Sequence, residues 1–417
     1  MEEIREIKDE FLKCMRCGNC QAVCPIYKET RKETEVARGK IQLIKGLLEG
    51  NLKPSPYLGE KIATCLTCLA CQENCPSGVN YEKILLFGRD YLAQENGVPL
   101  IKKAIFKVLR KPKLVNFGFK MASRFQGLVL KKVKGRPGRK LRFGLIEDHE
   151  NRLLPEIAKE TLVQKAKSKG GPGKEKLLYF PGCMINNVYV NVGEAVISVL
   201  KENGAEVKVL EKQSCCGTPA RVHGDIETAK KLGRYVLDTY LAEDAKIVIT
   251  SCSTCGTTFK KGYLELFNDE PEYLEKAKKL AQKTRDINEY LVEKGYKKPQ
   301  KLNFKVTYHD PCHLNRKLRV NEQPRKILHS LVGDNFIEMK KPSACCGGAG
   351  SFALTHYSLS KSIGNKKAKD IIGTGAKVVA TSCPACMMQL NDALAKEGVN
   401  VRVVHVAELL KEGYQEK

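Results

Sequence analysis

The sequence of 417 residues has no tryptophan, no long apolar run and no cysteine outside a patterned group. No stretch reaches 18 consecutive apolar residues, so a membrane-spanning helix is not expected. Residues 1–5 include three charged side chains, whereas a secretory signal needs a basic start followed by an apolar run. We therefore expect a cytoplasmic protein. Hydrophobic residues at 42% and charged residues at 29% exclude a mostly disordered or collagen-like chain.

Acidic residues are absent from residues 101–140, which contain fourteen lysines and arginines. The chain has a formal net charge of +25, and this segment supplies more than half of it. Apolar residues such as Ile105 and Leu114 lie among the lysines. The segment is therefore a solvated face, a surface for an acidic partner protein, or a peripheral contact with the inner face of the cell membrane. Nucleic-acid binding is not expected, because tryptophan and any recognised nucleic-acid-binding module are absent.

The 18 cysteines are the most informative feature of the composition. In a long chain without an export signal disulfides are disfavoured, so metal binding or redox chemistry is the better interpretation. The length itself suggests two to three domains.

Two cysteine runs near the N-terminus have the spacing of bacterial ferredoxins. They read Cys14-x-x-Cys17-x-x-Cys20-x-x-x-Cys24-Pro25 and Cys65-x-x-Cys68-x-x-Cys71-x-x-x-Cys75-Pro76. Three closely spaced thiolates wrap one face of a [4Fe–4S] cubane, and the fourth, before proline, reaches the other cluster. The sequence thus predicts one cluster on Cys14, Cys17, Cys20 and Cys75, and a second on Cys65, Cys68, Cys71 and Cys24. Zinc sites do not require the third cysteine or the Cys-Pro step.

An internal repeat begins near residue 177. Each unit has a strand ending at a single cysteine, then a Cys-Cys-Gly motif, then an apolar strand followed by Cys-x-x-Cys. In the first unit 31 and 35 residues separate the three groups, and in the second 32 and 36. Alternating strands and helices predict parallel α/β sheets, with the cysteines beyond the carboxyl ends of the strands. The simplest arrangement is two similar domains about a pseudo-twofold axis.

Each unit offers five cysteines, one more than the four iron corners of a cubane. The excess indicates an unusual cluster or a ligand that changes partner, and zinc binding by these thiolates stays open. The glycine after each cysteine pair permits a tight backbone that lets both sulfurs face one centre.

This pattern resembles the cysteine-rich "CCG" domain. Two such domains behind a two-cluster ferredoxin module resemble the iron–sulfur subunit of glycolate oxidase and of related lactate-oxidising complexes, and also the catalytic subunit of heterodisulfide reductase. The stretches from Cys345 to His356 and from Cys383 to Gln389 look most like the glycolate and lactate group. By resemblance, one further cluster is ligated by Cys183, Cys215, Cys216, Cys252 and Cys255, and another by Cys312, Cys345, Cys346, Cys383 and Cys386.

The resemblance implies a function in electron transfer. A partner subunit carrying FAD would oxidise glycolate or lactate, and electrons would pass through this chain to a quinone, an electron-transferring flavoprotein, a cytochrome or another acceptor. The alternative is a heterodisulfide reductase-like subunit that reduces a thiol disulfide at a noncubane cluster, because both units keep all five cysteines. A zinc-binding assembly protein is a third class.

The expected fold is a multidomain α+β and α/β protein, with an N-terminal helical ferredoxin module followed by two repeated α/β CCG domains. The predicted boundaries are 1–98 for the two-cluster module, 99–175 for a basic connector, 176–300 for the first CCG domain and 301–417 for the second. Residues 167–176 are expected to form an exposed linker.

Several smaller features accompany the cysteines. His223, His309 and His313 lie near cysteines in the sequence and are candidates for proton donation or tuning of a cluster. Arg221 and Lys366 are candidates for neutralising an anionic substrate or partner. The stretch Gly348-x-Gly350-x-x-Ala353 fits a relaxed dinucleotide fingerprint, but it follows a cysteine pair rather than a clear strand, so close approach of the backbone to a cluster is the better interpretation.

Overall fold

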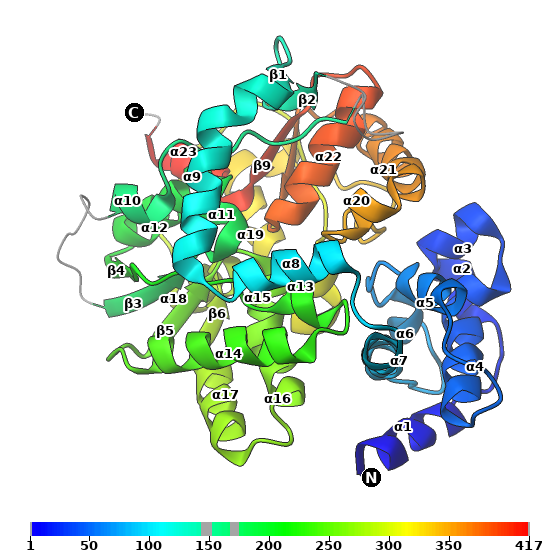
Figure 1. Cartoon of the computed structure of the whole chain (residues 1–417). Coiled ribbons are helices and arrows are strands. Elements are labelled where there is room, and N and C mark those ends of the chain that lie inside the picture. Colours follow the sequence, from blue (N-terminus) through cyan, green and yellow to red (C-terminus); the bar gives the residue numbers. More distant parts are fainter. Residues whose placement is uncertain (1, 143–151, 167–174, 416–417) are drawn as a thin grey trace.

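The computed structural model describes residues 2–142, 152–166 and 175–415 (Figure 1). The N-terminal module is entirely helical and lies to one side of the two sheets. Its core is formed by apolar faces that include Ile7, Ile41, Ile44, Ile62 and Ile84. Its helices are α1 (Glu2–Leu12), α2 (Asn19–Val23), α3 (Pro25–Thr30), η1 (Glu33–Glu35), α4 (Ala37–Leu48), α5 (Pro56–Ala63), α6 (Ala70–Glu73) and α7 (Tyr81–Asn96).

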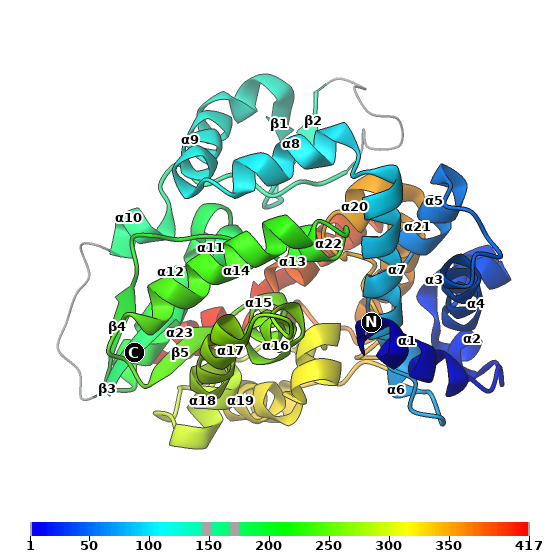
Figure 2. The same cartoon turned by 60° about the horizontal axis from the view of Figure 1, so that its bottom comes forward.

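The basic connector forms a helical hairpin on the outside of the molecule (Figure 2). Only a few of its side chains reach the interior, notably Phe106, which belongs to the core of the α/β units. Its elements are α8 (Leu100–Leu109), α9 (Pro112–Val129), β1 (Leu130–Lys132), β2 (Arg139–Leu141) and α10 (Leu162–Ala166). Of the expected linker, residues 167–174 lie outside the described residues, whereas Glu175 and Lys176 already belong to the next strand.

The first α/β unit has a parallel sheet with strand order β4-β3-β5-β6. Hydrophobic strands at its centre are buried on both faces, as parallel sheets require. Its elements are β3 (Glu175–Phe180), α11 (Gly182–Asn187), α12 (Val190–Glu202), β4 (Ala205–Val209), α13 (Thr218–Arg221), α14 (Ile226–Leu241), β5 (Ile247–Thr250), α15 (Ser253–Thr257), η2 (Thr258–Gly262), α16 (Tyr263–Leu266), α17 (Pro271–Lys283), β6 (Thr284–Asp286) and α18 (Ile287–Lys294).

The second unit repeats this plan with the parallel order β7-β8-β9. A parallel bridge between Val306 and Phe336 occupies the place that β4 has in the first unit. Its elements are β7 (Val306–Tyr308), η3 (His313–Lys317), α19 (Glu322–Val332), η4 (Gly333–Asn335), α20 (Phe352–Thr355), α21 (Tyr357–Ile372), β8 (Val378–Thr381), α22 (Pro384–Lys396), β9 (Arg402–His405) and α23 (Val406–Gln415).

The two units share one core and meet at the carboxyl ends of their strands. The imidazole Nε2 of His405, at the end of β9, lies 3.1 Å from the carbonyl oxygen of Ser251. The side-chain amide of Asn288, just after β6, donates to Ser382 Oγ at 3.1 Å. These reciprocal contacts join the last strand of each unit to the residue preceding the Cys-x-x-Cys motif of the other.

The predicted repeat of strands and helices is therefore present, with parallel sheets in both units. The short strands β6 and β9 and the β1–β2 hairpin were not predicted. Among the described residues, no helix is both long and apolar enough to cross a membrane.

Candidate metal centres

All 18 cysteines lie within the described residues, and all are free thiols. Five of them line one pocket in the N-terminal module, and four of these five are the predicted ligands of the first cluster. The fifth is Cys71. Arg38 stabilises the loop that carries Cys14 and Cys17, because its Nη1 donates to the carbonyl of Arg16 at 3.0 Å. The four are Cys14, Cys17, Cys20 and Cys75.

The four predicted ligands of the second cluster also lie together. Cys24 is close enough to Cys65 and Cys68 to interact with them electrostatically, and Cys71 interacts with all three. The N-cap thiol of α3, Cys24, accepts a hydrogen bond from the amide of Tyr27 at 3.4 Å. Burial raises the pKa of Cys24 to about 12. A thiol in that environment becomes a thiolate at neutral pH only when a metal ion binds it, which fits a metal-ligand role.

Two cations adjoin the second group of thiols, one of them buried and the other partly buried. Lys40, on the apolar face of α4, is almost fully buried and donates to the carbonyls of Lys61 and Thr34. Arg89 on α7 donates to the carbonyl of Cys65 at 3.0 Å. Both cations interact electrostatically with the thiol of Cys65. Sequence reasoning missed them, although a lysine at a core position of α4 was a visible signal.

The cysteines of the first unit form a line of thiol contacts. Cys183 contacts Cys215, the vicinal pair Cys215–Cys216 continues to Cys255, and Cys255 contacts Cys252. Contact with neighbouring thiols raises the pKa of Cys215 and lowers that of Cys216. Four of these cysteines are buried and Cys183 is partly buried. Five sulfurs in successive contact suit a metal centre and leave no isolated thiol.

The second unit repeats the line with one difference. Cys345, Cys346, Cys386 and Cys383 are in successive contact. Cys312 interacts electrostatically with Cys346 and Cys383 of that line and with Cys68. It also borders a small apolar cluster that contains Cys68 and against which Cys24 and Cys345 pack. Burial raises the pKa of the Cys312 thiol.

The glycines of the two Cys-Cys-Gly motifs have the same backbone conformation. Gly217 and Gly347 both have φ +86°. A Cβ atom on Gly347 would lie 2.6 Å from the carbonyl oxygen of Ser360, and one on Gly217 would lie 3.1 Å from that of Ala229. The turn therefore needs glycine both for its left-handed backbone and for its close packing on the following helix.

Two contacts join three of the four groups of thiols into one series. Cys252 of the first unit contacts Cys383 of the second. Cys68 of the N-terminal module contacts Cys345 of the second unit. A continuous path of sulfur atoms thus runs from the N-terminal module through the second unit into the first.

Paired hydroxyl groups hold the start of each Cys-x-x-Cys motif. Tyr179 on β3 lies 2.6 Å from Ser251 Oγ, and Tyr308 on β7 donates to Ser382 at 3.3 Å. Both serines are fully buried and immediately precede Cys252 and Cys383. The repeat therefore extends beyond the cysteines to the hydrogen bonds that position them.

The other candidate residues have varied surroundings. Arg221 forms an ion pair with Glu265 at 2.7 Å, and Lys366 forms one with Glu29 at 2.6 Å, so each already has an acidic partner within the chain. His313 has Thr254 Oγ1 and the Thr67 carbonyl oxygen at 3.3 Å from its two ring nitrogens.

The glycine-rich stretch after Cys346 lies against the second thiol line. A Cβ atom on Gly348 would lie 3.3 Å from the carbonyl oxygen of Ala385 and 3.6 Å from Cys346 Sγ. This supports close backbone approach to the thiols as the reason for the glycines.

A cavity of about 720 Å³ lies where the N-terminal module, α8 and both units meet. Its walls include Cys65, Lys102, His223, Ser351 and His356. His223 lies 2.5 Å from Ser351 Oγ and 3.3 Å from the Lys102 amine. Burial, together with the nearby cations, lowers the pKa of His223 to about 4. The cavity is therefore lined both by the neutral imidazole of His223 and by a predicted cluster ligand, Cys65.

A second cavity of about 720 Å³ lies on the other side of the contact between the N-terminal module and the second unit. Cys68 and Cys345 both border it, together with Arg316 and Lys367. The thiols of Cys68 and Cys345 thus border a cavity whose walls carry basic side chains.

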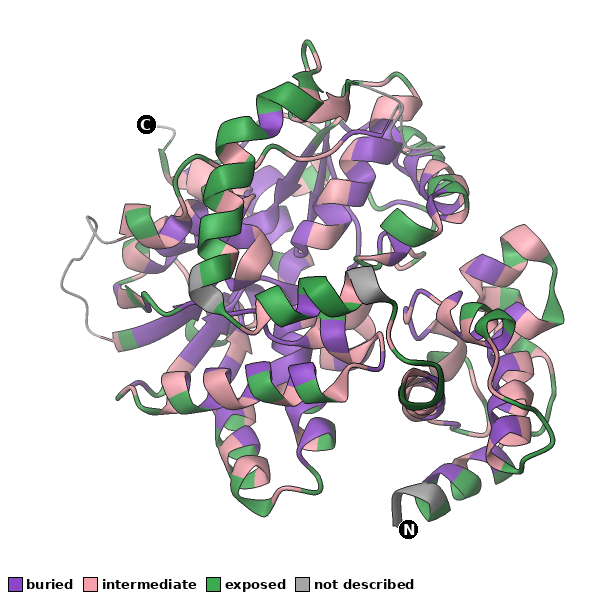
Figure 3. Ribbon diagram, in the orientation of Figure 1, coloured by how far each residue is buried: buried purple, intermediate pink, exposed green. Residues whose placement is uncertain are grey.

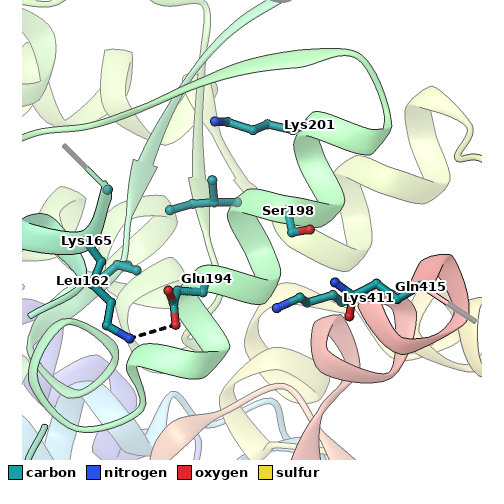
Figure 4. A pocket seen from close by; sticks show the side chains of 9 residues that line it. Leu162, Lys165, Glu194, Ser198, Lys201, Lys411 and Gln415 are labelled. Atoms are coloured by element: carbon teal, nitrogen blue, oxygen red, sulfur yellow. Dashed lines mark hydrogen bonds and ion pairs between the residues drawn. The ribbon is translucent and has the colours of Figure 1, made fainter. Parts of the chain in front are cut away.

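A separate pocket lies between α10, α12 and α23 (Figure 4). Lys165 pairs with Glu194 across it, and Lys201 and Lys411 also line it. No cysteine borders this pocket, so it is remote from the metal centres.

Comparisons with known proteins identify both parts of the chain. A 4Fe-4S dicluster domain matches residues 10–79, and a cysteine-rich domain (CCG) matches residues 177–260 and 306–391. With the clustered thiols, these matches show that the chain carries multiple iron–sulfur clusters.

Three relatives illustrate the range of similar proteins. A probable glycolate oxidase iron-sulfur subunit of Bacillus subtilis is 30% identical over 99% of this chain and 98% of its own length. Lactate utilization protein A of the same organism is 33% identical over 56% of this chain and 98% of its own length. A subunit of the fumarate reductase (CoM/CoB) of Methanothermobacter marburgensis is 29% identical over 97% of this chain and 72% of its own length. The chain therefore belongs to the family of iron–sulfur oxidoreductase subunits that join a 4Fe-4S dicluster domain to two cysteine-rich CCG domains.

Proposed function

We propose that this chain is the electron-transfer subunit of a flavin-dependent complex that oxidises a 2-hydroxy acid such as glycolate or lactate. The observation that carries the proposal is the continuous series of thiols, which includes the contacts Cys68–Cys345 and Cys252–Cys383. Iron–sulfur clusters on thiolates accept and release single electrons. A series of such sites in contact is suited to conduct electrons through the chain.

We assign four ligand groups to this path. The two N-terminal groups are those predicted from the ferredoxin spacing, and their members lie together in space. The other two are the five-cysteine sets of the two units. The corresponding domain boundaries are 1–98, 99–175, 176–300 and 301–417, which place the matched residues 10–79, 177–260 and 306–391 within separate domains.

A partner subunit is required for the oxidation itself. Removal of a hydride from a 2-hydroxy acid is flavin or nicotinamide chemistry, whereas thiolate-bound clusters carry electrons one at a time. The names of two relatives, a glycolate oxidase subunit and a lactate utilization protein, support an FAD-linked partner for this substrate class. The electrons would leave towards a quinone, a cytochrome or an electron-transferring flavoprotein.

One observation favours a second candidate function. Both units keep all five cysteines, and the excess over a cubane's four irons suits a site that binds a substrate sulfur. Reduction of a thiol disulfide would take two electrons, supplied one at a time through Cys68 and Cys345, and two protons.

Purification of the tagged chain from its own cells under anaerobic conditions tests the proposal. We expect an FAD-containing subunit to co-purify, and the visible absorbance of the clusters to bleach when glycolate or lactate is added to that complex. The separated chain should not respond to either acid. Absence of flavin from the purified complex, with dithionite-reduced chain cleaving a disulfide such as glutathione disulfide, would favour the second function instead.

We also propose that the connector holds the complex on an anionic membrane surface. Most of α9 is exposed (Figure 3). Its exposed large apolar side chains lie at helical spacing and so form a stripe along the helix. Leu128 is 70% exposed and Phe117 61%. Exposed cations, including Lys120 and Arg124, lie beside the stripe. An apolar stripe that cations flank, in a segment without acidic residues, is typical of helices that bind anionic lipid. The stripe is formed by Leu114, Phe117, Met121, Phe125 and Leu128.

A further inference from the structure

The two units differ at one buried position beside their thiols. The first unit reads Tyr179-Phe180-Pro181-Gly182-Cys183 where the second reads Tyr308-His309-Asp310-Pro311-Cys312. The two tyrosines occupy matching strands and make matching hydrogen bonds to serine, so Phe180 and His309 are equivalent. Both side chains are buried. The repeat therefore has a phenyl ring in one unit and an imidazole in the other.

Phe180 has an ordinary apolar environment. Its ring packs edge-on against Phe259 and Tyr240, with centroid separations of 4.7 and 5.3 Å. Packing of this kind stabilises the core without any polar partner. The phenyl ring at this position in the first unit offers no nitrogen to the thiols.

His309 faces the thiol line of the second unit. A ring nitrogen of His309 and the sulfurs of Cys346 and Cys386 all lie within 4.8 Å of one another, and all three residues are buried. The imidazole contacts Cys346 directly. His309 Nδ1 is buried without a hydrogen-bond partner among the described residues. A buried polar atom usually has a partner, so the unpaired Nδ1 indicates a ligand that the described residues do not supply.

The backbone fixes the position of this ring. The amide of His309 donates to the carbonyl of Ala380 at 2.9 Å, and its own carbonyl accepts from Thr381 Oγ1 at 3.1 Å. Both partners lie on β8, the strand that leads to Cys383. The histidine is thus held by the same strand that positions the Cys-x-x-Cys motif.

We propose that His309 is a nitrogen ligand of the iron–sulfur centre in the second unit, beside Cys346 and Cys386. The two units then have different donor sets: sulfur alone in the first, and nitrogen with sulfur in the second. A neutral imidazole adds a donor to the centre without adding negative charge, and the ligands of an iron–sulfur centre set its reduction potential. The centres of the two units should therefore differ in reduction potential, and that of the second unit is the one that contacts the N-terminal module through Cys345.

Pulsed electron paramagnetic resonance of the reduced holoprotein tests this ligand directly. We expect a nitrogen hyperfine coupling of the strength of a bound imidazole, which changes to the pattern of nitrogen-15 when the protein is grown with nitrogen-15 histidine. This measurement needs no substitution and so does not depend on whether a variant folds. Absence of a histidine coupling, or one only as weak as that of a hydrogen-bonded ring, would overturn the proposal.

Matched variants identify the histidine. His309→Phe introduces the residue that the first unit has at this position, and should abolish the coupling and shift one reduction potential. His313→Gln is the control, because both ring nitrogens of His313 already lie near protein oxygens. A coupling that persists in His309→Phe, or is lost in His313→Gln, would contradict the assignment.

Discussion

The thiol of Cys68 contacts the thiol of Cys345, although the two cysteines are 277 positions apart in the sequence. Arg316 spans this contact, because its Nη1 donates to the Cys68 carbonyl at 3.2 Å and its Nη2 to the Ser343 carbonyl at 2.8 Å. A third bond joins its Nε to Glu73 at 2.9 Å. One guanidinium thus ties the loop of the second ferredoxin-type cluster to the second CCG unit.

Replacing Arg316 should separate these two parts of the electron path. Arg316→Ala loses three hydrogen bonds, two of them to backbone carbonyls, and we expect about 3 kcal/mol of destabilisation. Rapid-mixing reduction should show slower electron equilibration between the N-terminal module and the second unit, with an unchanged iron content.

Arg319→Ala is the matched control for this variant. Arg319 also pairs with Glu73, at 2.7 Å, but its side chain is 68% exposed. An exposed ion pair contributes little, so stability and electron equilibration should stay close to those of the parent protein. Equal effects of the two substitutions would contradict a specific role for Arg316.

The glycine before Cys183 should be essential for the centre of the first unit. Gly182 has φ +68°, and a Cβ atom there would lie 3.0 Å from Cys255 Sγ. Gly182→Ala should therefore displace a ligand sulfur and lower the iron content. Gly204→Ala is the control, because Gly204 has φ +82° but nothing within 4 Å of the added Cβ. We expect that variant to lose only about 1 kcal/mol from backbone strain and to keep its iron.

Asp286 should make stability fall as pH rises towards neutrality. Burial raises the pKa of this carboxyl to about 7, and its Oδ2 has no hydrogen-bond partner among the described residues. The folded state therefore holds a proton that the unfolded state has lost, so the stabilisation is full below the unfolded pKa and is lost as pH rises to about 7.

Asp286→Asn removes this titration and keeps an N-cap residue for α18. Between about pH 5.5 and 8 the parent should lose about 2 kcal/mol relative to the variant. Denaturant unfolding at each pH measures the difference. Parallel pH profiles of parent and variant would show that the Asp286 carboxyl does not titrate in this range.

Binding of the connector to lipid should depend on both charge and apolar surface. The chain should co-sediment with vesicles containing phosphatidylserine, and less with purely zwitterionic vesicles or in high salt. Serine at Phe117, Phe125 and Leu128 together should reduce binding at least tenfold, because each exposed ring or aliphatic group otherwise enters the membrane interface.

Leu12→Ser is the control for the apolar stripe. Leu12 is 79% exposed but lies on α1 of the N-terminal module, away from the connector. Vesicle binding should be unchanged in this variant. If anionic vesicles do not bind the parent protein while an acidic partner subunit does, the connector is a protein-docking surface instead.

Much of the architecture could be predicted because the cysteine motifs repeat at fixed distances. The strands that precede Cys183, Cys252 and Cys383 were identified from apolar runs that end near a cysteine. Strands β6 and β9 were missed because no cysteine motif follows them to mark where a strand ends.

Contacts between distant segments could not be predicted from the sequence. The pairs Cys68–Cys345 and Cys252–Cys383 depend on how the module and the two units pack, and motif spacing contains no information on that packing. Arg316 is equally inconspicuous in the sequence, since a single arginine after a cysteine is more often solvated. The sequence repeat does show that Phe180 and His309 occupy equivalent positions. That His309 lies beside the Cys346 sulfur, however, is seen only in the structure.

The central claim is that all four cysteine groups hold iron–sulfur clusters that form one electron path. Iron, acid-labile sulfide and zinc, measured together on anaerobically purified protein, test it most directly. We predict about sixteen iron atoms per chain, a similar amount of sulfide and little zinc, as four four-iron clusters require. About eight iron atoms with one or two zinc ions would restrict the clusters to the N-terminal module, and would contradict a path through the two CCG units.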